Sequence, residues 1–461
     1  MGTTVSLDSL SLLPELVDVM KELNYQHFTP IQSASIPILL KGEDLIGQSK
    51  TGSGKTLAFT VPILQKIELE SLEIQALVLC PTRELCAQVA REMRKLGRKL
   101  SGLKVLIVAG GEPSRPQTEA LYKGVHIVVG TPGRVLDHLN RRRLHLERIN
   151  TLVLDEADRM LDMGFQEDME FIIDAASSAR QTVFFSATFP DSIQAMSRRF
   201  QKNPQKILIE DSAEAAPDIE QFILETSAEQ KSLNLINLLK SESATAAIVF
   251  CNLKVTVAEL AASLSKVGFS ATGLHGDLEQ DDRNKVLAKF RNGSIQILVA
   301  TDVAARGLDI EDLPLVINYD LPYELDGYVH RIGRTGRAGK KGKAVSFMVF
   351  GEELRLNQIE RFVGLKFSKL NPKSGQNEIP QRAEMETLQI SAGRKEKMRP
   401  GDILGALTGE AGQLQRSDIG KIEIHDHYSF VAVSRHLVQI AMERLRDGKI
   451  KGRKFFIHIV K

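Results

Sequence analysis

The stretch DLIGQSKTGSGKTLAFTVPILQKI, residues 44–67, predicts the fold of the first part of the chain. A short apolar run, DLIGQ, is followed by a glycine-rich turn and then by a longer apolar segment with helical spacing. Strands that are apolar on both faces and alternate with helices are typical of a parallel sheet covered by helices. We therefore predict an α/β domain over residues 1–210. Its further strands are expected at residues 76–82, 105–111, 126–132, 152–158 and 182–188.

The same alternation begins again after a polar connection around residues 211–217. This repetition predicts a second parallel-sheet domain over residues 211–370. Open sheets of this kind bind ligands at the carboxyl ends of their strands, and polar or glycine residues follow the apolar runs here. The runs of the second domain lie at residues 246–252, 270–277, 295–302, 315–320 and 343–349.

The last part of the chain differs in composition from both α/β domains. Residues 371–384 are poor in apolar residues and contain two prolines, which predicts a linker. Residues 385–461 fit a small α+β domain with the order βαββαβ. They contain 14 Lys and Arg against 9 Asp and Glu, a net charge of +5, whereas the whole chain carries only +2. This local excess of positive charge indicates a nucleic-acid partner.

Length and composition exclude several classes of protein. No run of 18 or more apolar residues occurs in the 461 residues, so we expect no membrane partner. The cysteines, Cys80, Cys86 and Cys251, have neither zinc-binding nor disulfide spacing, which favours a reducing cytoplasm. No coiled-coil repeat is present, and we expect a monomer.

The glycine-rich turn after DLIGQ has the pattern of a phosphate-binding loop. Such a loop joins a strand to a helix, and its glycines let backbone N–H groups point at phosphate oxygens. Lys55 is placed to reach the β- and γ-phosphates, and the Thr56 hydroxyl to ligate Mg²⁺. The sequence therefore predicts ATP and Mg²⁺ as cofactors, bound by Ser49, Lys50, Thr51, Gly52, Ser53, Gly54, Lys55 and Thr56.

Three carboxylates end the apolar run in VLDEADRM, residues 153–160. Carboxylates this close together repel one another, so a positive partner is required, and Mg²⁺–ATP at the phosphate loop supplies it. We predict that Asp155 holds Mg²⁺ and that Glu156 orients and deprotonates the attacking water. Asp158 lies farther along the chain and is expected to pair with hydroxyl groups or arginines.

A series of short motifs across residues 20–340 resembles those of the DEAD-box RNA helicases. This resemblance implies two tandem RecA-like domains, RNA-stimulated ATP hydrolysis and local separation of short RNA duplexes. It also implies that ATP and RNA are each bound by both domains. Besides the phosphate loop and DEAD (155–158), the motifs are YQHFTPIQ (25–32), PTREL (81–85), GG (110–111), TPGR (131–134), SAT (186–188), FCN (250–252), HGDLEQDDR (275–283), TDVAARGLDI (301–310) and HRIGRTGR (330–337).

The resemblance assigns roles at the nucleotide site. Tyr25 is expected to stack on the adenine and Gln32 to hydrogen-bond its edge. Arg334 and Arg337 resemble arginine fingers that reach the γ-phosphate. The implied catalytic residues are Lys55, Glu156, Arg334 and Arg337. Two further nucleotide-binding residues are Gly307 and Asp309. The residues expected to couple hydrolysis to RNA separation are Asp158, Ser186, Thr188 and His330.

Contacts to the RNA backbone are implied for loops of both α/β domains. Their hydroxyl, N–H and guanidinium groups suit phosphate oxygens. Each motif alone would fit an ordinary turn, but their order along the chain favours the functional interpretation. The implied residues are Pro81, Thr82, Arg83, Gly110, Gly111, Thr131, Pro132, Gly133, Arg134, Asn252, Gly276, Gln280, Arg283 and Thr301.

The C-terminal domain partly matches an RNA-recognition motif in DHYSFVAV, residues 426–433, with Tyr428 and Phe430 at the base-stacking positions. The usual basic and glycine positions hold Asp426 and His427, so the alternative is that both rings pack at the sheet surface. The loop GKIKGRK, residues 448–454, alternates glycine with basic residues and suits an RNA backbone. Its predicted contacts are Lys449, Lys451, Arg453 and Lys454.

With KMRPGDILGALTGEAG (397–412) ahead of it, this domain resembles the C-terminal domain of the DbpA helicases, a bacterial subfamily. The resemblance implies a hairpin of large-subunit ribosomal RNA near the peptidyl-transferase centre as partner, within the pre-ribosomal large subunit. The chain would then act in ribosome assembly. A general RNA helicase and an ATP-gated RNA clamp without a specific rRNA target are the alternatives.

Overall fold

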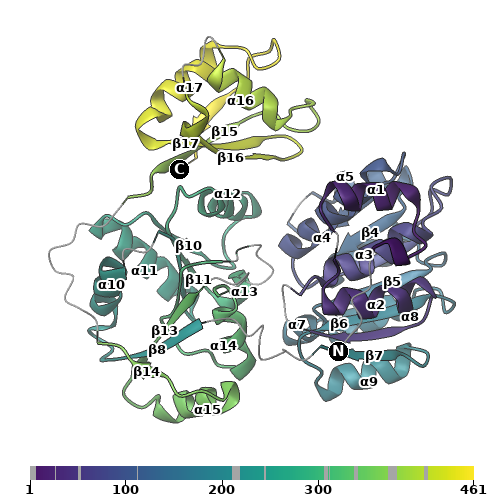
Figure 1. Ribbon diagram of the computed structural model, residues 1–461, viewed down its shortest axis with the longest axis horizontal. Helices are drawn as coiled ribbons and strands as arrows, with labels where there is room; N and C mark the ends of the chain where they lie inside the picture. Colours follow the sequence, from purple (N-terminus) through teal and green to yellow (C-terminus); the bar gives the residue numbers. More distant parts are fainter. Residues whose placement is uncertain are drawn as a thin grey trace. The chain divides into compact units, whose positions relative to one another are not determined.

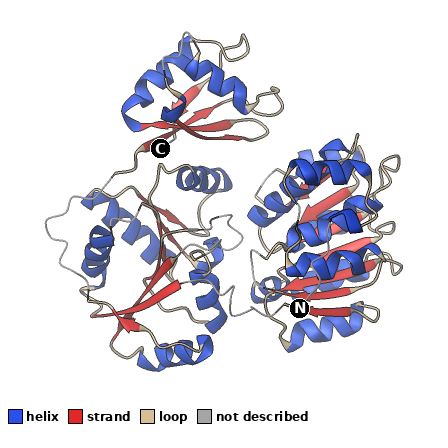
Figure 2. Cartoon of the chain, in the orientation of Figure 1, coloured by secondary structure: helices blue, strands red, loops and turns tan. Residues whose placement is uncertain are grey.

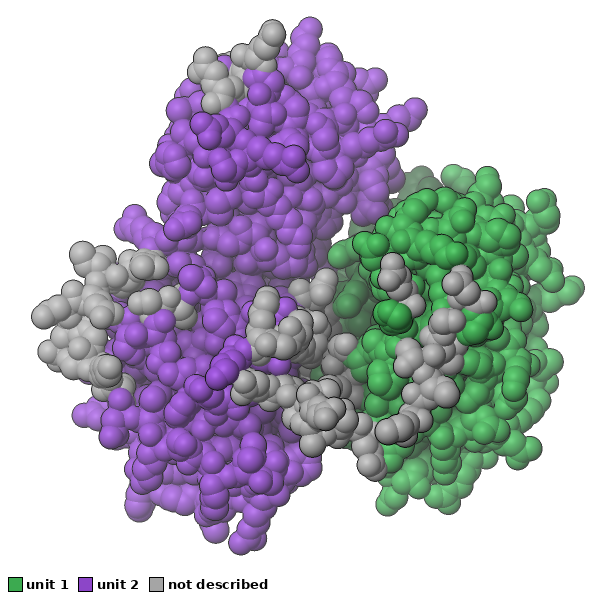
Figure 3. All heavy atoms as spheres, viewed as in Figure 1, with its two compact units in different colours: residues 1–216, 307–309 green, residues 217–306, 310–461 purple. Residues whose placement is uncertain are grey.

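A computed structural model describes residues 7–25, 27–49, 53–111, 113–209, 219–242, 245–305, 310, 312–336, 341–371, 382–409 and 414–460. The chain forms two compact units, residues 1–216 with 307–309 and residues 217–306 with 310–461 (Figure 3). The second unit contains both the predicted second α/β domain and the predicted C-terminal domain. Most of the predicted 371–384 linker lies outside the described residues.

The first unit contains a seven-stranded parallel sheet with the strand order β3-β4-β2-β5-β6-β1-β7 (Figure 1). Because every pairing is parallel, the carboxyl ends of all its strands lie at one edge. The strands are β1 (Leu45–Gln48), β2 (Ala76–Leu79), β3 (Val105–Val108), β4 (Ile127–Gly130), β5 (Thr151–Asp155), β6 (Gln181–Ser186) and β7 (Gln205–Leu208).

Helices cover both faces of this sheet (Figure 2). Successive side chains of a strand point to opposite faces, so Val153 of β5 joins one apolar cluster while Leu152 and Leu154 join the other. The first cluster is completed by α1 (Pro14–Glu22), α2 (Pro30–Leu40), α3 (Lys55–Lys66) and α4 (Arg83–Leu96). The second is completed by α6 (Pro132–Asn140), α7 (Ala157–Asp162), α8 (Gln166–Asp174) and α9 (Asp191–Phe200), while α5 (Ser114–Tyr122) contributes Leu121.

The second unit begins with another seven-stranded parallel sheet, of order β10-β11-β9-β12-β13-β8-β14. Its strands are β8 (Ile219–Thr226), β9 (Ala247–Phe250), β10 (Ala271–Leu274), β11 (Ile297–Ala300), β12 (Leu315–Asn318), β13 (Gly342–Val349) and β14 (Ser368–Lys369). The helices are α10 (Lys231–Glu242), α11 (Lys254–Val267), α12 (Gln280–Arg291), α13 (Asp302–Ala305), α14 (Leu325–Ile332) and α15 (Glu353–Val363). The predicted tandem α/β architecture is therefore confirmed.

The C-terminal part of the second unit is a four-stranded antiparallel sheet of order β16-β17-β15-β18. Its elements follow the predicted βαββαβ order: β15 (Met385–Ile390), α16 (Pro400–Thr408), β16 (Ile419–Ile424), β17 (Ser429–Ser434), α17 (Val438–Asp447) and β18 (Ile457–Ile459). Leu388, Val431 and Ile457 pack with residues of both helices in one apolar cluster, so one face of the sheet forms the core. Within the described ranges, no helix has the length and apolar character needed to span a bilayer.

Candidate nucleotide site and nucleic-acid interface

The phosphate loop is held closed by contacts within the protein. Gly54, just before α3, has φ of +95°, a left-handed conformation that favours glycine. The buried Lys55 donates a 2.8 Å hydrogen bond from Nζ to the carbonyl oxygen of Ser49. The Ser49 and Ser53 hydroxyls lie 2.8 Å apart. These contacts bring the two ends of the loop together, with Thr56 in the first turn of α3. The predicted site residues outside the described part of the chain are Lys50, Thr51, Gly52, Gly307, Asp309 and Arg337.

The segment predicted to bind adenine is tied directly to this loop. Gln32 donates from Nε2 to the Gly54 carbonyl oxygen at 3.0 Å, and its Oε1 accepts from the Thr29 backbone N–H at 2.9 Å. Thr29 also donates its hydroxyl to the Ser53 carbonyl oxygen at 2.8 Å. Tyr25 packs at the edge of the first apolar cluster. The segments predicted to bind adenine and phosphate therefore form one connected structure in the first unit.

Asp155 and Glu156 occupy the carboxyl end of β5 as buried groups with unused hydrogen-bonding capacity. Asp155 Oδ1 and Glu156 Oε2 are buried without a hydrogen-bond partner. Burial raises the pKa of Asp155 to about 7, although the positive charge of Lys55 acts in the opposite direction. Glu156 has φ of +55°, a costly backbone conformation that is common at functional sites. Carboxylate oxygens without a hydrogen-bond partner, with Lys55 near enough to influence Asp155, fit a Mg²⁺–nucleotide, because a hydrated Mg²⁺ binds such oxygens.

Asp158 links the carboxylate motif to the SAT motif after β6. Its Oδ2 accepts hydrogen bonds from the Thr188 backbone N–H at 2.8 Å and from the Thr188 hydroxyl at 2.9 Å. Its own backbone N–H donates to the Ser186 hydroxyl at 3.2 Å. Burial alone would raise the pKa of Asp158, but these hydrogen bonds hold it below its ordinary value. A movement of either motif would therefore be transmitted to the other.

The three predicted RNA-binding loops of the first unit follow β2, β3 and β4, which are neighbours in the sheet. The Thr82 hydroxyl caps α4 by accepting from the Leu85 backbone N–H at 3.3 Å. Gly111 has φ of +75°, and a Cβ there would overlap the guanidinium group of Arg83. The Pro81–Arg83, Gly110–Gly111 and Thr131–Arg134 loops thus lie along one stretch of the sheet edge.

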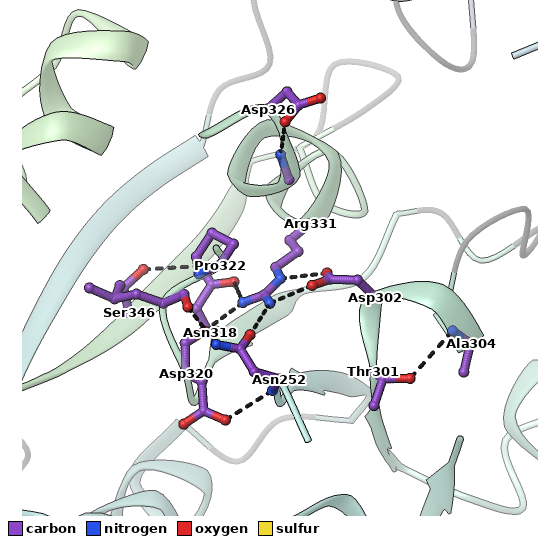
Figure 4. A network of polar contacts seen from close by, with 12 residues as sticks. Asn252, Thr301, Asp302, Ala304, Asn318, Asp320, Pro322, Asp326, Arg331 and Ser346 are labelled. Carbon is purple, nitrogen blue, oxygen red and sulfur yellow. Dashed lines mark hydrogen bonds and ion pairs between the residues drawn. The ribbon is translucent and has the colours of Figure 1, made fainter. Parts of the chain in front are cut away.

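Arg331 is the centre of a polar network in the second unit that the sequence analysis did not single out (Figure 4). Its guanidinium is 1% exposed and donates to both carboxylate oxygens of Asp302 at 2.6 Å. It also donates to the Asn318 side chain at 3.3 Å, to the Asp320 carbonyl oxygen at 2.5 Å and to the Asn252 side chain at 2.8 Å. Two residues in the quoted motifs could have indicated this network: Arg331, the second residue of HRIGRTGR, and Asp302, which directly follows Thr301.

This network fixes the predicted RNA-binding residue Asn252. Its backbone N–H donates to Asp320 at 3.0 Å, and its side-chain nitrogen donates to the Leu321 carbonyl oxygen at 2.9 Å. Lys231 forms a 2.6 Å ion pair with Asp320. The carboxylates are therefore matched by cations, which partly buried charges require.

The other predicted residues of the second unit lie on helices around this network. Gln280 donates to Asn284 on α12 at 3.1 Å, and Arg283 donates to the Ala304 carbonyl oxygen of α13 at 3.3 Å. The Thr301 hydroxyl accepts from the Ala304 backbone N–H at 3.4 Å (Figure 4). His330 lies on α14, Arg334 just after it, and Gly276 in the turn before α12.

Helix α12 also contacts the open face of the C-terminal sheet. Phe430 of β17 is 1% exposed and packs with Ala288 of α12 and Val460. Asn284 donates to the Tyr428 hydroxyl at 3.3 Å, while the Tyr428 ring stacks on His425 with 4.6 Å between centroids. Phe430 therefore packs at the sheet surface, as in the second of the two interpretations of the sequence.

An ion pair fastens the same contact. Arg291 at the end of α12 donates to both carboxylate oxygens of Glu423 at 3.0 and 2.8 Å. Burial opposes ionisation, but the hydrogen bond with His425 and the Arg291 charge hold the pKa of Glu423 well below its ordinary value. Asn292 donates to the Thr387 hydroxyl of β15 at 3.0 Å. No sequence motif predicts this contact, because the partners are far apart along the chain.

The basic loop before β18 faces solvent. Lys449, Lys451, Arg453 and Lys454 are all exposed. A backbone bridge between Ile450 and Arg453 closes the loop. The Lys451 Nζ donates to the Lys397 carbonyl oxygen at 3.0 Å. Several cations on one closed loop fit the phosphate backbone of a nucleic acid.

Three family models match this chain in succession. "DEAD/DEAH box helicase" matches residues 29–196, "Helicase conserved C-terminal domain" matches residues 230–339, and "DbpA RNA binding domain" matches residues 387–459. The first match contains β1–β6, the second contains β9–β12, and the third spans most of the C-terminal antiparallel sheet.

One similar protein matches over nearly all of this chain, and two others match over about four fifths of it. The ATP-dependent RNA helicase DbpA of Escherichia coli is 47% identical over 457 residues, 99% of this chain and 100% of that protein. The DEAD-box ATP-dependent RNA helicase CshA of Geobacillus kaustophilus is 45% identical over 80% of this chain and 78% of that protein. The solved structure of S. cerevisiae Dbp5 bound to RNA and ADP BeF3 has a TM-score of 0.72 at 31% identity, covering 79% of this chain and 95% of that one.

Proposed function

We propose that this chain, which belongs to the DEAD-box family of ATP-dependent RNA helicases, is directed by its C-terminal domain to a hairpin of large-subunit ribosomal RNA. One observation carries the proposal: residues 387–459 match the DbpA RNA binding domain in a chain that resembles E. coli DbpA along nearly its whole length. ATP use and RNA binding follow from family membership, and the identity of the RNA is the proposed step. The hairpin lies near the peptidyl-transferase centre, so the activity would serve assembly of the large subunit in the cytoplasm, with the chain acting as a monomer.

The exposed basic loop supports RNA binding by this domain. Its cations lie in the part of the domain that α12 does not contact, whereas Phe430 and Glu423 are occupied by Ala288 and Arg291. Contacts to phosphates anchor an RNA but do not read its sequence, so recognition through this loop would depend on hairpin shape. A tethered domain of this kind raises the local concentration of one RNA around the helicase.

We assign the chemistry of hydrolysis to the carboxyl end of β5 and the phosphate loop. Lys55 neutralises the β- and γ-phosphates of ATP, while Asp155 and Thr56 hold Mg²⁺. Glu156 orients a water molecule and takes its proton as the oxygen attacks the γ-phosphorus and the bond to the ADP oxygen breaks. When bound, Mg²⁺ supplies neutralisation of the developing phosphate charge. Arg334 and Arg337 stabilise the same charge.

The coupling of hydrolysis to RNA is proposed to use two internal networks. In the first unit, Asp158 ties the carboxylate motif to Ser186 and Thr188. In the second unit, Arg331 ties the helix before Arg334 to Asn252 and to the residue after Thr301. Both networks consist of buried or partly buried polar groups, which have few alternative partners and therefore move together.

The test is steady-state ATP hydrolysis with no RNA, with an unstructured RNA, and with an rRNA fragment that contains the peptidyl-transferase hairpin. We expect the fragment to stimulate at a concentration at least tenfold lower than the unstructured RNA. Arg453→Glu should remove most of this preference, because it reverses a charge in the basic loop. Arg416→Glu is the matched control, since Arg416 is an exposed arginine of the same domain outside the loop. Equal stimulation by both RNAs would instead indicate a general RNA helicase, and retention of RNA without strand separation an ATP-gated clamp.

A further inference from the structure

Gln117 of α5 is a buried amide between two of the proposed RNA-binding loops of the first unit. It is 3% exposed. Its Nε2 donates a 3.0 Å hydrogen bond to the carbonyl oxygen of Ala109, directly before Gly110. Its Oε1 accepts a 3.2 Å hydrogen bond from the guanidinium group of Arg134. One amide group therefore joins the backbone of one loop to the side chain of the other.

His138 of α6 fixes this amide from the interior. The ring is fully buried, and its Nε2 lies 3.1 Å from the Gln117 oxygen. Because Ala109 offers a carbonyl oxygen and Arg134 offers donors, the amide has only one satisfactory orientation. An amide oxygen only accepts, so the proton of His138 must be on Nε2.

The rest of the His138 environment keeps the imidazole neutral. Nδ1 is buried without a hydrogen-bond partner, so a second proton would have no acceptor. Burial lowers the pKa of His138; Asp137 acts against this, while the positive charges of Arg134, Arg143 and Arg141 add to it. The ring is thus a permanent single donor to Gln117 at neutral pH.

The two loops joined by Gln117 also meet a third. Arg83 lies against Gly111, where the absence of a Cβ leaves room for the guanidinium group. Arg83, the Gly110–Gly111 turn and Arg134 follow β2, β3 and β4, which are adjacent in the sheet. Gln117 and His138 are both buried, whereas Gly110 and Arg134 are partly exposed.

We propose that Gln117 and His138 are positioning residues for RNA binding, which hold Arg134 and the Gly110–Gly111 turn in the spacing of successive RNA phosphates. An arginine that is already restrained loses less conformational entropy when it binds a phosphate. A turn with a fixed carbonyl group likewise presents its N–H groups in one direction. The inference rests on the proposed RNA contacts of Gly110, Gly111 and Arg134, and it adds two residues that do not touch RNA themselves.

The first test uses Gln117→Leu, which keeps the buried volume but removes all three hydrogen bonds. ATP hydrolysis is measured against the concentration of an unstructured RNA at saturating ATP. We expect the half-maximal RNA concentration to rise about tenfold, the change associated with loss of a hydrogen bond to a charged group. The maximal rate and the KM for ATP should stay unchanged, since neither residue contacts the nucleotide site.

The matched control is Gln75→Leu. Gln75 is another buried glutamine of the first unit, and its amide donates to the Glu68 and Ser71 carbonyl oxygens, away from the RNA loops. Both variants lose buried amide hydrogen bonds, so both should unfold at a lower temperature. Only Gln117→Leu should change the half-maximal RNA concentration. An equal rise for Gln75→Leu would reduce the effect to general destabilisation and overturn the proposal.

A second pair of variants tests the donor role of His138. His138→Gln restores an N–H donor towards Gln117, whereas His138→Leu does not. We expect near wild-type RNA dependence for the first and a rise of about threefold for the second. This pair decides the question if Gln117→Leu fails to fold.

The outcomes separate this inference from the proposed function. Equal half-maximal RNA concentrations for wild type, Gln117→Leu and His138→Leu would overturn the positioning role and leave the RNA contacts intact. If a folded Arg134→Ala variant bound RNA as tightly as wild type, Arg134 would not contact RNA, and the inference would lose the contact on which it depends.

Discussion

Two groups of carboxylates lie at equivalent places in the two parallel sheets, but they differ in their hydrogen-bond and ion-pair partners. At the end of β5, Asp155 and Glu156 retain buried oxygen atoms without hydrogen-bond partners. After β11 and β12, Asp302 and Asp320 are paired with Arg331 and Lys231 at 2.6 Å. The first group keeps carboxylate oxygen atoms that have no hydrogen-bond partner among the described residues, and the second has its charge neutralised by the protein.

This difference in partners suits the first group to binding a ligand and the second to holding the protein's own residues in place. A buried charge that lacks a partner costs stability, and a protein retains it where a bound group supplies the partner. A carboxylate that is already matched by arginine and lysine has little affinity left for a metal ion. On the proposed function, the same parallel-sheet edge serves the nucleotide in the first unit, while in the second unit it holds Asn252, Thr301 and α14 in place.

The largest effect is expected for Glu156→Gln. The amide keeps the shape of the side chain but cannot accept the proton of the attacking water, so ATP turnover should fall by roughly 10²–10⁴-fold. The free energy of unfolding should change by no more than about 1 kcal/mol, because the amide oxygen can still face Arg159 and replace the 3.4 Å ion pair with a neutral contact.

Steady-state ATP hydrolysis and urea unfolding measure these two quantities on the same preparation. Turnover within threefold of wild type would show that another group accepts the proton. A clear loss of stability would show that Glu156 stabilises the fold as the paired carboxylates of the second unit do. The contrast between the two groups would then be wrong.

The next largest effect is expected for Arg331→Met, measured as the free energy of unfolding in urea. The substitution leaves the Asp302 carboxylate without its cation and the Asn252 side-chain oxygen without its donor, at a cost of roughly 3 kcal/mol. Adding Asp302→Asn to this variant should recover part of the loss, because the unpaired charge is then gone.

Arg355→Met is the matched control for this change. Arg355 donates to the Pro322 carbonyl oxygen at 2.8 and 2.6 Å rather than to a carboxylate, so its replacement should cost only about 1 kcal/mol. Equal losses for both arginines would mean that Arg331 acts through ordinary hydrogen bonds rather than through charge.

The sequence predicted the ligand site better than the scaffold, for a physical reason. The phosphate loop and the DEAD motif are local: their function depends on residues adjacent in the chain at the end of one strand. The Arg331 network depends on residues 79 positions apart or on neighbouring strands, which only the strand order brings together. Gln117 was missed in the same way, because a lone glutamine on a helix carries no signal until α5 and α6 are packed.

In the C-terminal domain, a sequence motif predicted a strand correctly but did not predict what the side chains of that strand contact. DHYSFVAV was assigned correctly to a strand of an RNA-recognition-like sheet, and β17 covers its second half. The side chain at Phe430, however, packs against Ala288 of α12. Base stacking at Phe430 was one of two interpretations of this motif, and the contact with Ala288 agrees with the other, in which the ring packs at the sheet surface.

A smaller, pH-dependent effect is expected for Glu423→Gln at the contact between α12 and the C-terminal sheet. The pKa of Glu423 is lowered in the folded protein from an ordinary value of 4.5, so its ionised form stabilises the fold above that pH. This contribution should be lost as the pH falls below 4.5 towards the lower folded-state value. At pH 7 the variant should be less stable by about 1–2 kcal/mol.

Urea unfolding of wild type and Glu423→Gln between pH 7.5 and pH 3 tests this sign. The stability of wild type should decline more steeply below pH 4.5, so the two curves should converge in acid. Parallel curves would mean that Arg291, Lys421 and His425 do not hold the carboxylate in its ionised form.

The smallest effect is expected for Glu73→Gln, which tests whether an exposed carboxylate matters less than a buried one. Glu73 forms a 3.8 Å ion pair with Arg148, but both side chains are largely exposed. Water screens such a pair and the long side chains lose entropy in forming it, so the melting temperature should change by less than about 2 °C. We therefore expect the effect of a carboxylate on this protein to depend on where it lies: mainly on turnover at the buried end of β5, mainly on stability where it is partly buried and paired, and on neither where it is exposed. A large loss of stability from Glu73→Gln would contradict this order, because burial would then not be the property that separates the two sheet edges.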